Sequence, residues 1–346
     1  MHTDKPTEKL RSGRVTLKML AAELNLDPAT VSVVLNNVPG RSIPEPTRER
    51  IRTLALKRNY QPSFIARSLR SSRTMTIGVL VPVLSEGYHS EVLNGIYDYL
   101  LEEHYFNFIV CHRHRPELIE RYPDMLVSRG VEGIIAIDTH LTHELIVPAV
   151  SVAGHSHIHG VSNVVLDHNV AAHDALKHLY DLGHRSIAFM RGQPYSADSN
   201  VRWESLVNAA RELGLPIDPE LTVQLTEDVT SPELGYPTAQ QLIQKHHSFS
   251  AIVCFNDLAA IGVTRALHDA QIRVPQDISV VGFDDLQLAE FNTPRLTTIR
   301  QPLHEMGALA ARTLLAKLNA GTEMPGQIAV CPKLIVREST GPARQI

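Results

Sequence analysis

The stretch VTLKMLAAELNLDPATVSVVLNN, residues 15–37, carries two short helical patterns joined by a turn. Thr16 can cap the first helix, and Asp27 can cap the second, whose first position is taken by Pro28 because no backbone donor is needed there. Asn25 stands in the turn, where a left-handed backbone is needed that Asn tolerates. Apolar residues recur on one face of each segment: Leu17, Leu20, Ala21 and Leu24, then Val31, Val34 and Leu35. The spacing favours a helix-turn-helix, although an αα-hairpin used only for packing would look the same.

The flanking sequence completes a small all-α unit. Residues 1–14 are polar and lack any period, which predicts a disordered tail. A third helix is predicted for residues 46–57, and its buried face would consist of Ile51, Leu54 and Ala55. The segment SFIARSLR, residues 63–70, has a capping residue but is too short to form a stable helix without a partner.

The charge of the chain is divided unevenly. Residues 1–73 hold 14 Lys and Arg against 6 Asp and Glu, a net charge of +8, whereas residues 74–346 hold 19 against 31, a net charge of −12. Only the N-terminal part suits a polyanion, and its basic residues form no amphipathic stripe with bulky apolar anchors. Nucleic acid is therefore the expected partner, and a membrane is not.

The remaining composition indicates a cytoplasmic globular protein. The sequence has no apolar run of about 18 residues and no signal-peptide pattern at its start. Cys111 and Cys254 end apolar runs typical of buried strands, and Cys331 lies far from both. We expect reduced core cysteines with no disulfide and no metal role.

From residue 76 onward, apolar strand patterns alternate with amphipathic helices. The predicted strands are Ile77–Val81, Phe108–Val110, Gly133–Ile137, Val150–Val152, Val164–Leu166, Ile187–Met190, Ala251–Phe255 and Ser279–Gly282. Helices are predicted at Glu91–Glu103, Ala171–Asp181, Ser205–Leu213 and Leu258–Ala270. This alternation predicts an α/β fold with parallel sheets, and some 270 residues are too many for one such sheet of ordinary size. Two lobes are therefore expected.

Eight sequence blocks occur in the order found in one family. They are VTLKMLAAELNLDPATVSVVLNN, PEPTRERI, NYQPSFIARSLRSSRTMTIGVLVP, LGHRSIAF, FNDLAAIG, RVPQDISVVGFDD, LTTIRQPLHEMG and LIVREST. By these blocks the chain resembles the lactose-repressor (LacI/GalR) family of bacterial transcriptional regulators. The resemblance implies a homodimer, or a dimer of dimers, on a pseudo-palindromic operator. It also implies a small-molecule effector between two lobes related to periplasmic sugar-binding proteins.

The resemblance further implies a domain division. A helix-turn-helix DNA-binding domain is expected at residues 15–62, with a hinge helix and linker at 63–74. The effector-binding domain would span 75–340. Its N-lobe is expected at about 75–165 and 299–325, and its C-lobe at about 166–298 and 326–340. The absence of a leucine-heptad tail after Thr340 favours a dimer over a tetramer.

In the family the second helix enters the major groove. The corresponding candidates for contacts to bases or phosphates are Ala29, Thr30, Ser32 and Val33, together with Thr16 at the start of the first helix. Val33 departs from the family, which commonly has Arg there, so operator sequences of relatives do not transfer directly. As an alternative, Val33 is simply part of the core. Arginines expected at phosphates or in the grooves are Arg41, Arg48, Arg67 and Arg70.

The hinge block matches Ala66, Arg67 and Leu69, which would pair with the dimer mate in the minor groove. There Leu69 would act as an apolar wedge that unstacks a central base step, unless it is a linker leucine packed on the domain body. We expect Leu69→Ala to weaken binding to a specific operator while the fold stays intact.

Polar residues at predicted strand ends match family effector positions. These candidates are Tyr88, His89, Arg202, Asn256 and Asp284. Arg202 lacks the Gly-Phe that usually follows it in the family, because Ser205 and Leu206 stand there. Asp257 and Asp285 are assigned to helix capping and lobe packing. An Arg, Asn and Asp set suits a neutral polyhydroxylated ligand, so a sugar is favoured over a nucleobase or another metabolite.

Eighteen histidines raise the question of a metal site. His155, His157 and His159 alternate, as do His112 and His114, but no third or fourth ligand follows at a spacing typical of zinc. A solvated loop is the interpretation we favour, with His155 placed to border the cleft.

Two other function classes were weighed. No phosphate-binding glycine loop, nucleophile elbow or HExxH motif occurs, so an enzyme is not expected and no cofactor is predicted. A solute-binding protein without a DNA role would also have two lobes, but it would need an export signal and would have no basic N-terminal segment.

Overall fold

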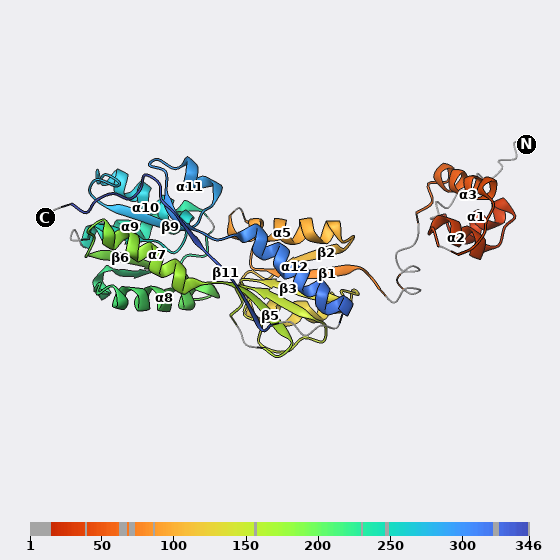
Figure 1. Cartoon of the computed structure of the whole chain (residues 1–346), viewed down its shortest axis with the longest axis horizontal. Helices are drawn as coiled ribbons and strands as arrows, with labels where there is room; N and C mark the ends of the chain where they lie inside the picture. The colour runs from red at the N-terminus through yellow and green to blue at the C-terminus, as the bar shows by residue number, and fades with distance from the viewer. Residues whose placement is uncertain are drawn as a thin grey trace, which may run out of the picture. The chain divides into compact units, whose positions relative to one another are not determined.

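The chain consists of two compact units, residues 1–74 and 75–346 (Figure 1). The computed structural model describes residues 15–38, 40–61, 68, 73–85, 87–155, 158–229, 231–245, 249–320 and 325–344. No helix among these residues is both long and apolar enough to cross a bilayer.

The first unit is a three-helix bundle. Its helices are α1 (Leu17–Leu24), α2 (Pro28–Leu35) and α3 (Glu45–Lys57). They pack around one small core, whose buried members are Leu20, Ala21, Val31, Val34, Ile51 and Ala55. The predicted third helix is confirmed, with Leu54 only partly buried at the edge of this core.

The second unit contains two six-stranded sheets, each the centre of one lobe. The N-lobe sheet has the order β11-β5-β4-β3-β1-β2, and all its pairs are parallel. Its strands are β1 (Thr76–Val81), β2 (Phe106–Cys111), β3 (Gly133–Ile137), β4 (Ala149–Val152), β5 (Val161–Leu166) and β11 (Gln327–Val330). Around it lie α5 (Tyr88–Glu102), α6 (Pro116–Val127) and α12 (Leu303–Ala320). The predicted parallel α/β fold is confirmed for this lobe.

The C-lobe sheet has the order β12-β10-β9-β8-β6-β7, which repeats the arrangement of the first sheet. Its strands are β6 (Ile187–Arg191), β7 (Thr222–Gln224), β8 (Ala251–Val253), β9 (Ser279–Asp284), β10 (Thr297–Arg300) and β12 (Lys333–Ile335), of which only β12 is antiparallel. Its helices are α7 (His168–Asp181), α8 (Asp198–Glu212), α9 (Tyr236–Lys245), α10 (Asp257–Asp269) and α11 (Gln287–Phe291), with short 3₁₀ turns at Pro219–Leu221 and Pro232–Leu234.

Three crossings connect the lobes, after β5, after β10 and after β11. Because β10 belongs to the C-lobe sheet, residues 299 and 300 lie in the C-lobe and not in the N-lobe as predicted. Because β11 pairs with β5, residues 327–330 lie in the N-lobe, so the predicted boundary at 326 is wrong by a few residues. The hydrophobic pattern of the sequence could not assign β10 and β11 to a lobe, because both strands are short and each lies next to a connection between the lobes.

Helices α5 and α12 pack with their backbones in close contact (Figure 1). A Cβ at Gly95 would collide with the carbonyl oxygen of His304, and one at Gly307 would collide with that of Val92. The two glycines therefore permit the approach that buries the N-lobe core between this helix pair and the sheet.

The edge strand β2 differs from its prediction as a buried strand. Phe106 is 61% exposed and Ile109 is 42% exposed, and Cys111 is only partly buried. Cys331 is exposed, so of the three cysteines expected in the core only Cys254 lies there; all three are free thiols. The strand lies at the end of the sheet, and only one of its edges is paired.

Candidate functional site

The turn between α1 and α2 has the predicted local geometry. The Thr16 hydroxyl accepts a hydrogen bond from the Met19 backbone N–H at 3.3 Å, and the Asp27 carboxylate accepts one from that of Ala29 at 2.7 Å. Asn25 adopts a left-handed conformation with φ 53°. The caps satisfy backbone donors at both helix starts, so the two short helices are held in a defined bend.

The predicted DNA-contacting residues differ in exposure. Ala29, Arg41 and Thr16 are exposed, and Thr30 and Ser32 are partly buried. Val33 is only 8% exposed, but it does not belong to the core cluster of the bundle, so its prediction as a base contact and the alternative that it is part of the core both stand.

Arg48, which was predicted as a phosphate contact, also forms hydrogen bonds to backbone carbonyl oxygens of its own domain. Its Nε donates to the carbonyl oxygen of Ile43 at 3.1 Å, and its Nη2 donates to that of Arg41 at 3.3 Å. The guanidinium thus supports the loop before α3. The remaining predicted contacts, Ala66, Arg67, Leu69 and Arg70, lie outside the described residues.

In the second unit, a cavity of about 750 Å³ lies where the carboxyl ends of the two sheets face each other. All five residues predicted for effector binding line it: Tyr88, His89, Arg202, Asn256 and Asp284. This volume includes space open to solvent, and parallel sheets commonly bind ligands at this edge.

Arg202 is the central cation of the cavity and is 5% exposed. Its Nη2 donates to Asp198 Oδ2 at 2.8 Å, and its Nη1 donates to the carbonyl oxygen of Phe255. The guanidinium carbon lies 4.5 Å from the ring centre of Phe255 and 3.7 Å from that of Phe283. Two rings and two hydrogen bonds therefore hold its plane in one orientation.

Asn256 and Asp284 each have a role in the fold as well. Asn256 caps α10 by accepting from the Ala259 N–H at 2.9 Å, a role the sequence analysis had assigned to Asp257. Asp257 instead accepts from the Leu286 N–H and the Thr298 hydroxyl. These contacts agree with its assignment to packing.

Asp284 ends β9 in a left-handed conformation with φ 112°, and Gln301 Nε2 donates to its Oδ1 at 2.6 Å. Gln301 lies in one of the crossings between the lobes, so this bond links the cavity wall to the hinge. Burial raises the pKa of Asp284 to about 7, against the lowering effects of Arg202 and Gln301.

The lobes touch across the cavity through acidic and aromatic groups that no sequence pattern predicted. Asp138, which follows β3, accepts from the Ala197 N–H at 2.8 Å and from the Ser196 hydroxyl at 3.3 Å in the C-lobe. The His114 ring lies 4.1 Å from the ring of Tyr195. Asp138 could have been found from its place at the end of an apolar strand, whereas Tyr195 follows no recognisable pattern.

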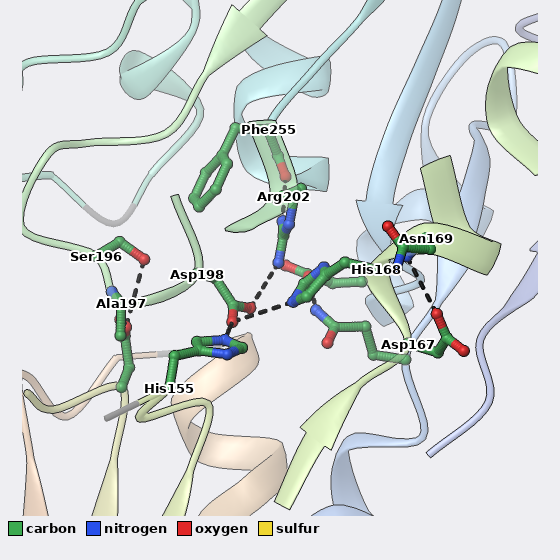
Figure 2. A network of polar contacts seen from close by, with 12 residues as sticks. His155, Asp167, His168, Asn169, Ser196, Ala197, Asp198, Arg202 and Phe255 are labelled. Carbon is green, nitrogen blue, oxygen red and sulfur yellow. Dashed lines mark hydrogen bonds and ion pairs between the residues drawn. The ribbon is translucent and has the colours of Figure 1, made fainter. Parts of the chain in front are cut away.

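A second contact between the lobes is made by His155. Its Nε2 lies 2.6 Å from Asp198 Oδ1, and His168 Nε2 lies 3.3 Å from the same oxygen. Figure 2 shows the Asp198 carboxylate between these imidazoles and Arg202. The interpretation of His155 as part of a solvated loop is wrong, because its side chain is 15% exposed and is bound to the facing lobe. His155 does not line the cavity itself but contacts Asp198, which does.

Electrostatics in this network follows from burial. Desolvation acts to raise the pKa of Asp198, but the His168 and His155 imidazoles and Arg202 outweigh it and hold this pKa well below its usual value. Desolvation lowers the pKa of His168. Asp198 is therefore a permanent anion to which three donors from two lobes converge.

Three polar atoms at the cavity have no hydrogen-bond partner among the described residues. They are Tyr88 Oη, His89 Nε2 and Arg202 Nε. His89 Nε2 lies 3.5 Å from Asp138 Oδ2, too far for a hydrogen bond but close enough for attraction. Buried polar atoms without partners are rare in folded proteins, and here two come from α5 of the N-lobe and one from α8 of the C-lobe, all on residues that line the cavity.

Comparison with known proteins gives consistent relatives for the whole chain. Residues 176–340 match the model of a periplasmic binding protein-like domain. The HTH-type transcriptional repressor PurR of Glaesserella parasuis serovar 5 is 31% identical over 338 residues, which are 94% of this chain and 98% of that protein. The HTH-type transcriptional regulator RegA of Clostridium saccharobutylicum is 31% identical over 340 residues, 94% of this chain and 99% of that protein.

Solved structures repeat the fold. The lac repressor dimer bound to operator and the anti-inducer ONPF matches with a TM-score of 0.85 at 24% identity, over 95% of this chain and all of that chain. The complex of the transcriptional regulator CelR with cellobiose matches with a TM-score of 0.68 at 25% identity, over 94% of this chain and all of that one.

Proposed function

Because this chain belongs to the lactose-repressor (LacI/GalR) family of helix-turn-helix transcriptional regulators, we propose that it represses genes from a pseudo-palindromic operator under the control of an effector bound between its lobes. It is a DNA-binding regulator and not an enzyme. The observation that carries the effector proposal is the convergence of five predicted ligand residues on one cavity that both lobes line.

The effector we propose is a sugar or a related polyhydroxylated metabolite. The unpartnered Tyr88 Oη and Arg202 Nε can donate to hydroxyl oxygens, and Asp284 can accept from hydroxyl groups. Rings of Tyr88, Tyr195 and Phe255 line the same space and suit the apolar faces of a sugar ring. An anionic ligand is disfavoured because Asp138, Asp198 and Asp284 outnumber the single Arg202.

The control mechanism we propose is a shift between lobe arrangements. The lobes touch through Asp138 and His155, while a ligand in the cavity would contact residues of both. Any effector that binds one arrangement better shifts the population toward it, and the N-lobes of a dimer then change their separation at the DNA.

Operator binding is tested with the full-length chain and fragments of genomic DNA in a gel-shift selection at low salt. Arg41→Ala should lower the slope of log affinity against log salt by about 1 if Arg41 contacts a phosphate. Arg265→Ala is the matched control, because Arg265 is a 68% exposed arginine on α10 of the C-lobe. Absence of any sequence preference over random competitor DNA would refute the proposal.

The effector is tested by thermal shift with sugars, nucleobases and other metabolites, followed by the gel shift with each hit. A sugar should raise the melting temperature of the wild type and less so that of Tyr88→Phe, which lacks the unpartnered hydroxyl. A nucleobase hit in place of any sugar would overturn the ligand class but keep the regulator. The gel shift also shows whether the effector acts as inducer or corepressor.

We also propose that the chain forms a homodimer through the edge of the N-lobe. The relative in the solved operator complex is a dimer. In this chain the edge strand β2 and helix α5 leave large apolar side chains exposed: Tyr97, Leu101, Phe106, Phe108 and Ile109. Of these, Phe106 and Phe108 form a patch on one face of β2, with ring centres 5.5 Å apart. Phe106→Asp should shift the molar mass in light scattering from dimer to monomer. Ile146→Asp is the control, because Ile146 is 80% exposed away from this patch.

A further inference from the structure

The trio His155, His168 and Asp198 has the composition of a metal-binding site. One ligand atom from each lies within 4.8 Å of the other two. The three come from distant parts of the sequence: the loop after β4, the start of α7 and the start of α8. Two imidazoles and one carboxylate form a set that binds zinc and related first-row metals and leaves further coordination positions open.

We propose that His155, His168 and Asp198 bind a divalent transition metal ion, most favourably Zn²⁺, that joins the two lobes beside the effector cavity, which Asp198 lines. His155 belongs to the N-lobe, whereas His168 and Asp198 belong to the C-lobe. An ion held by all three would stabilise the arrangement in which the lobes touch. The inference needs only the geometry between the lobes and does not depend on which effector or operator the chain binds.

The contacts of Asp198 are those of a metal-ligating carboxylate whose second oxygen is held by another side chain. Both imidazoles face Oδ1, while Arg202 Nη2 holds Oδ2 at 2.8 Å. A metal ion on Oδ1 would leave that outer contact in place, and such second-layer hydrogen bonds typically orient metal ligands. The His168 ring is held in turn by stacking on Phe283, with ring centres 6.2 Å apart.

Two of the three donor separations can be compared with those around a zinc ion, and the third is at most 4.8 Å. Two donors about 2.0–2.1 Å from a tetrahedral zinc ion lie about 3.3 Å apart. His168 Nε2 and Asp198 Oδ1 already have this separation, at 3.3 Å. His155 Nε2 is closer to Asp198 Oδ1, at 2.6 Å. Its imidazole must therefore retreat by about 0.7 Å to admit the ion, a movement that a slight opening of the lobes would supply.

The charge of the cavity also favours a cation. Four carboxylates line the cavity: Asp198 and Asp284 are buried, Asp138 is partly buried and Asp228 is exposed, whereas Arg202 is the only arginine or lysine among the described lining residues. A proton offsets part of this charge at Asp284, whose pKa is raised to about 7. Buried carboxylates in excess of buried cations are costly unless a positive charge compensates them. A divalent ion on Asp198 would add positive charge beside this group of carboxylates.

The test is zinc binding by the full-length chain, freed of its purification tag and treated with EDTA. Calorimetry with ZnCl₂ in the presence of a competing chelator should give one tight site per chain with release of protons. CoCl₂ should give a visible absorption band of a four- or five-coordinate site. His155→Gln and His168→Gln should each weaken zinc binding at least 100-fold and abolish the rise in melting temperature that zinc causes.

His159→Gln is the matched control, because His159 lies in the same loop region and its side chain is 91% exposed. It should bind zinc as the wild type does, which also accounts for adventitious binding by surface histidines. Circular dichroism checks that each variant is folded. If His168→Gln unfolds, His155→Gln still tests the proposal, because His155 lies in a loop. Equal zinc affinity in wild type and His155→Gln, or no site in the wild type that survives the chelator, would overturn the proposal. Operator binding by the EDTA-treated protein tests the regulator proposal separately.

Discussion

Replacing Arg202 by Met would remove the cation that compensates a buried carboxylate. Arg202 and Asp198 are each 5% exposed, and their ion pair measures 2.8 Å. Breaking a buried pair from one side costs about 3–5 kcal/mol, since the remaining charge stays buried. Loss of the cation–π contacts that the Arg202 guanidinium makes with the Phe255 and Phe283 rings adds about 0.5–2 kcal/mol. The apolar Met side chain partly restores the packing against these rings. We expect Arg202→Met to lower the free energy of unfolding of the C-lobe by about 3–5 kcal/mol.

The assay is thermal unfolding followed by circular dichroism and calorimetry without any ligand. For a lobe of about 150 residues, each kcal/mol corresponds to about 2–4 °C, so the melting temperature should fall by about 6–20 °C. Arg265→Met is the control: Arg265 forms an exposed pair with Asp269, and its loss should cost less than about 0.5 kcal/mol.

A double-mutant cycle separates the pair from the packing. Asp198→Asn combined with Arg202→Met should be less destabilised than the sum of the single variants by at least about 1.5 kcal/mol, because no unpaired charge then remains. The reasoning is refuted if Arg202→Met melts within 2 °C of the wild type, a margin of roughly 1 kcal/mol, or if the two substitutions are additive.

Three further predictions concern other parts of the molecule. Asp284 has its pKa raised from 3.8 to about 7, so the native state keeps a proton that the unfolded state loses; this contribution to stability is complete below about pH 4 and is lost as the pH rises to about 7. Asp284→Asn should therefore gain about 2–4 kcal/mol relative to the wild type between pH 5 and pH 8, and a pH-independent difference in melting temperature would contradict this. Gly95→Ala should destabilise the N-lobe by about 1–3 kcal/mol in urea unfolding through collision with α12, whereas Gly326→Ala, with no atom near its Cβ position, should be neutral; equal midpoints would contradict the packing argument. Val33→Ala should lower the stability of the first unit by about 1–2 kcal/mol in thermal unfolding, and an unchanged melting temperature together with altered operator preference would instead favour Val33 as a base contact.

The polar network around Asp198 shows where prediction from sequence reached its limit. Arg202 was found because it matches a family position, but neither Asp198 nor His168 stands at a spacing that predicts contact with His155. The three are separated by up to 43 residues, and three secondary-structure elements, β5, α7 and β6, lie between His155 and Asp198. Only the packing of α7 on α8, and of one lobe against the other, brings their side chains to one point.

By itself, the sequence determined the features that depend on neighbours in the chain. Caps at Thr16 and Asp27, the left-handed turn at Asn25 and the apolar periods of strands and helices are local, because backbone hydrogen bonding and burial of one face act over a few residues. The separation of charge between basic residues 1–73 and acidic residues 74–346 is likewise a property of composition.

Tertiary structure alone decided which strands join which lobe, that β2 is an exposed edge and that Arg48 serves the backbone of its own loop. It also decided that His155 reaches Asp198 across the cavity. These outcomes depend on contacts between segments far apart in the chain. Their free energy comes from burial and charge compensation in the assembled fold, and no local pattern of residues encodes it.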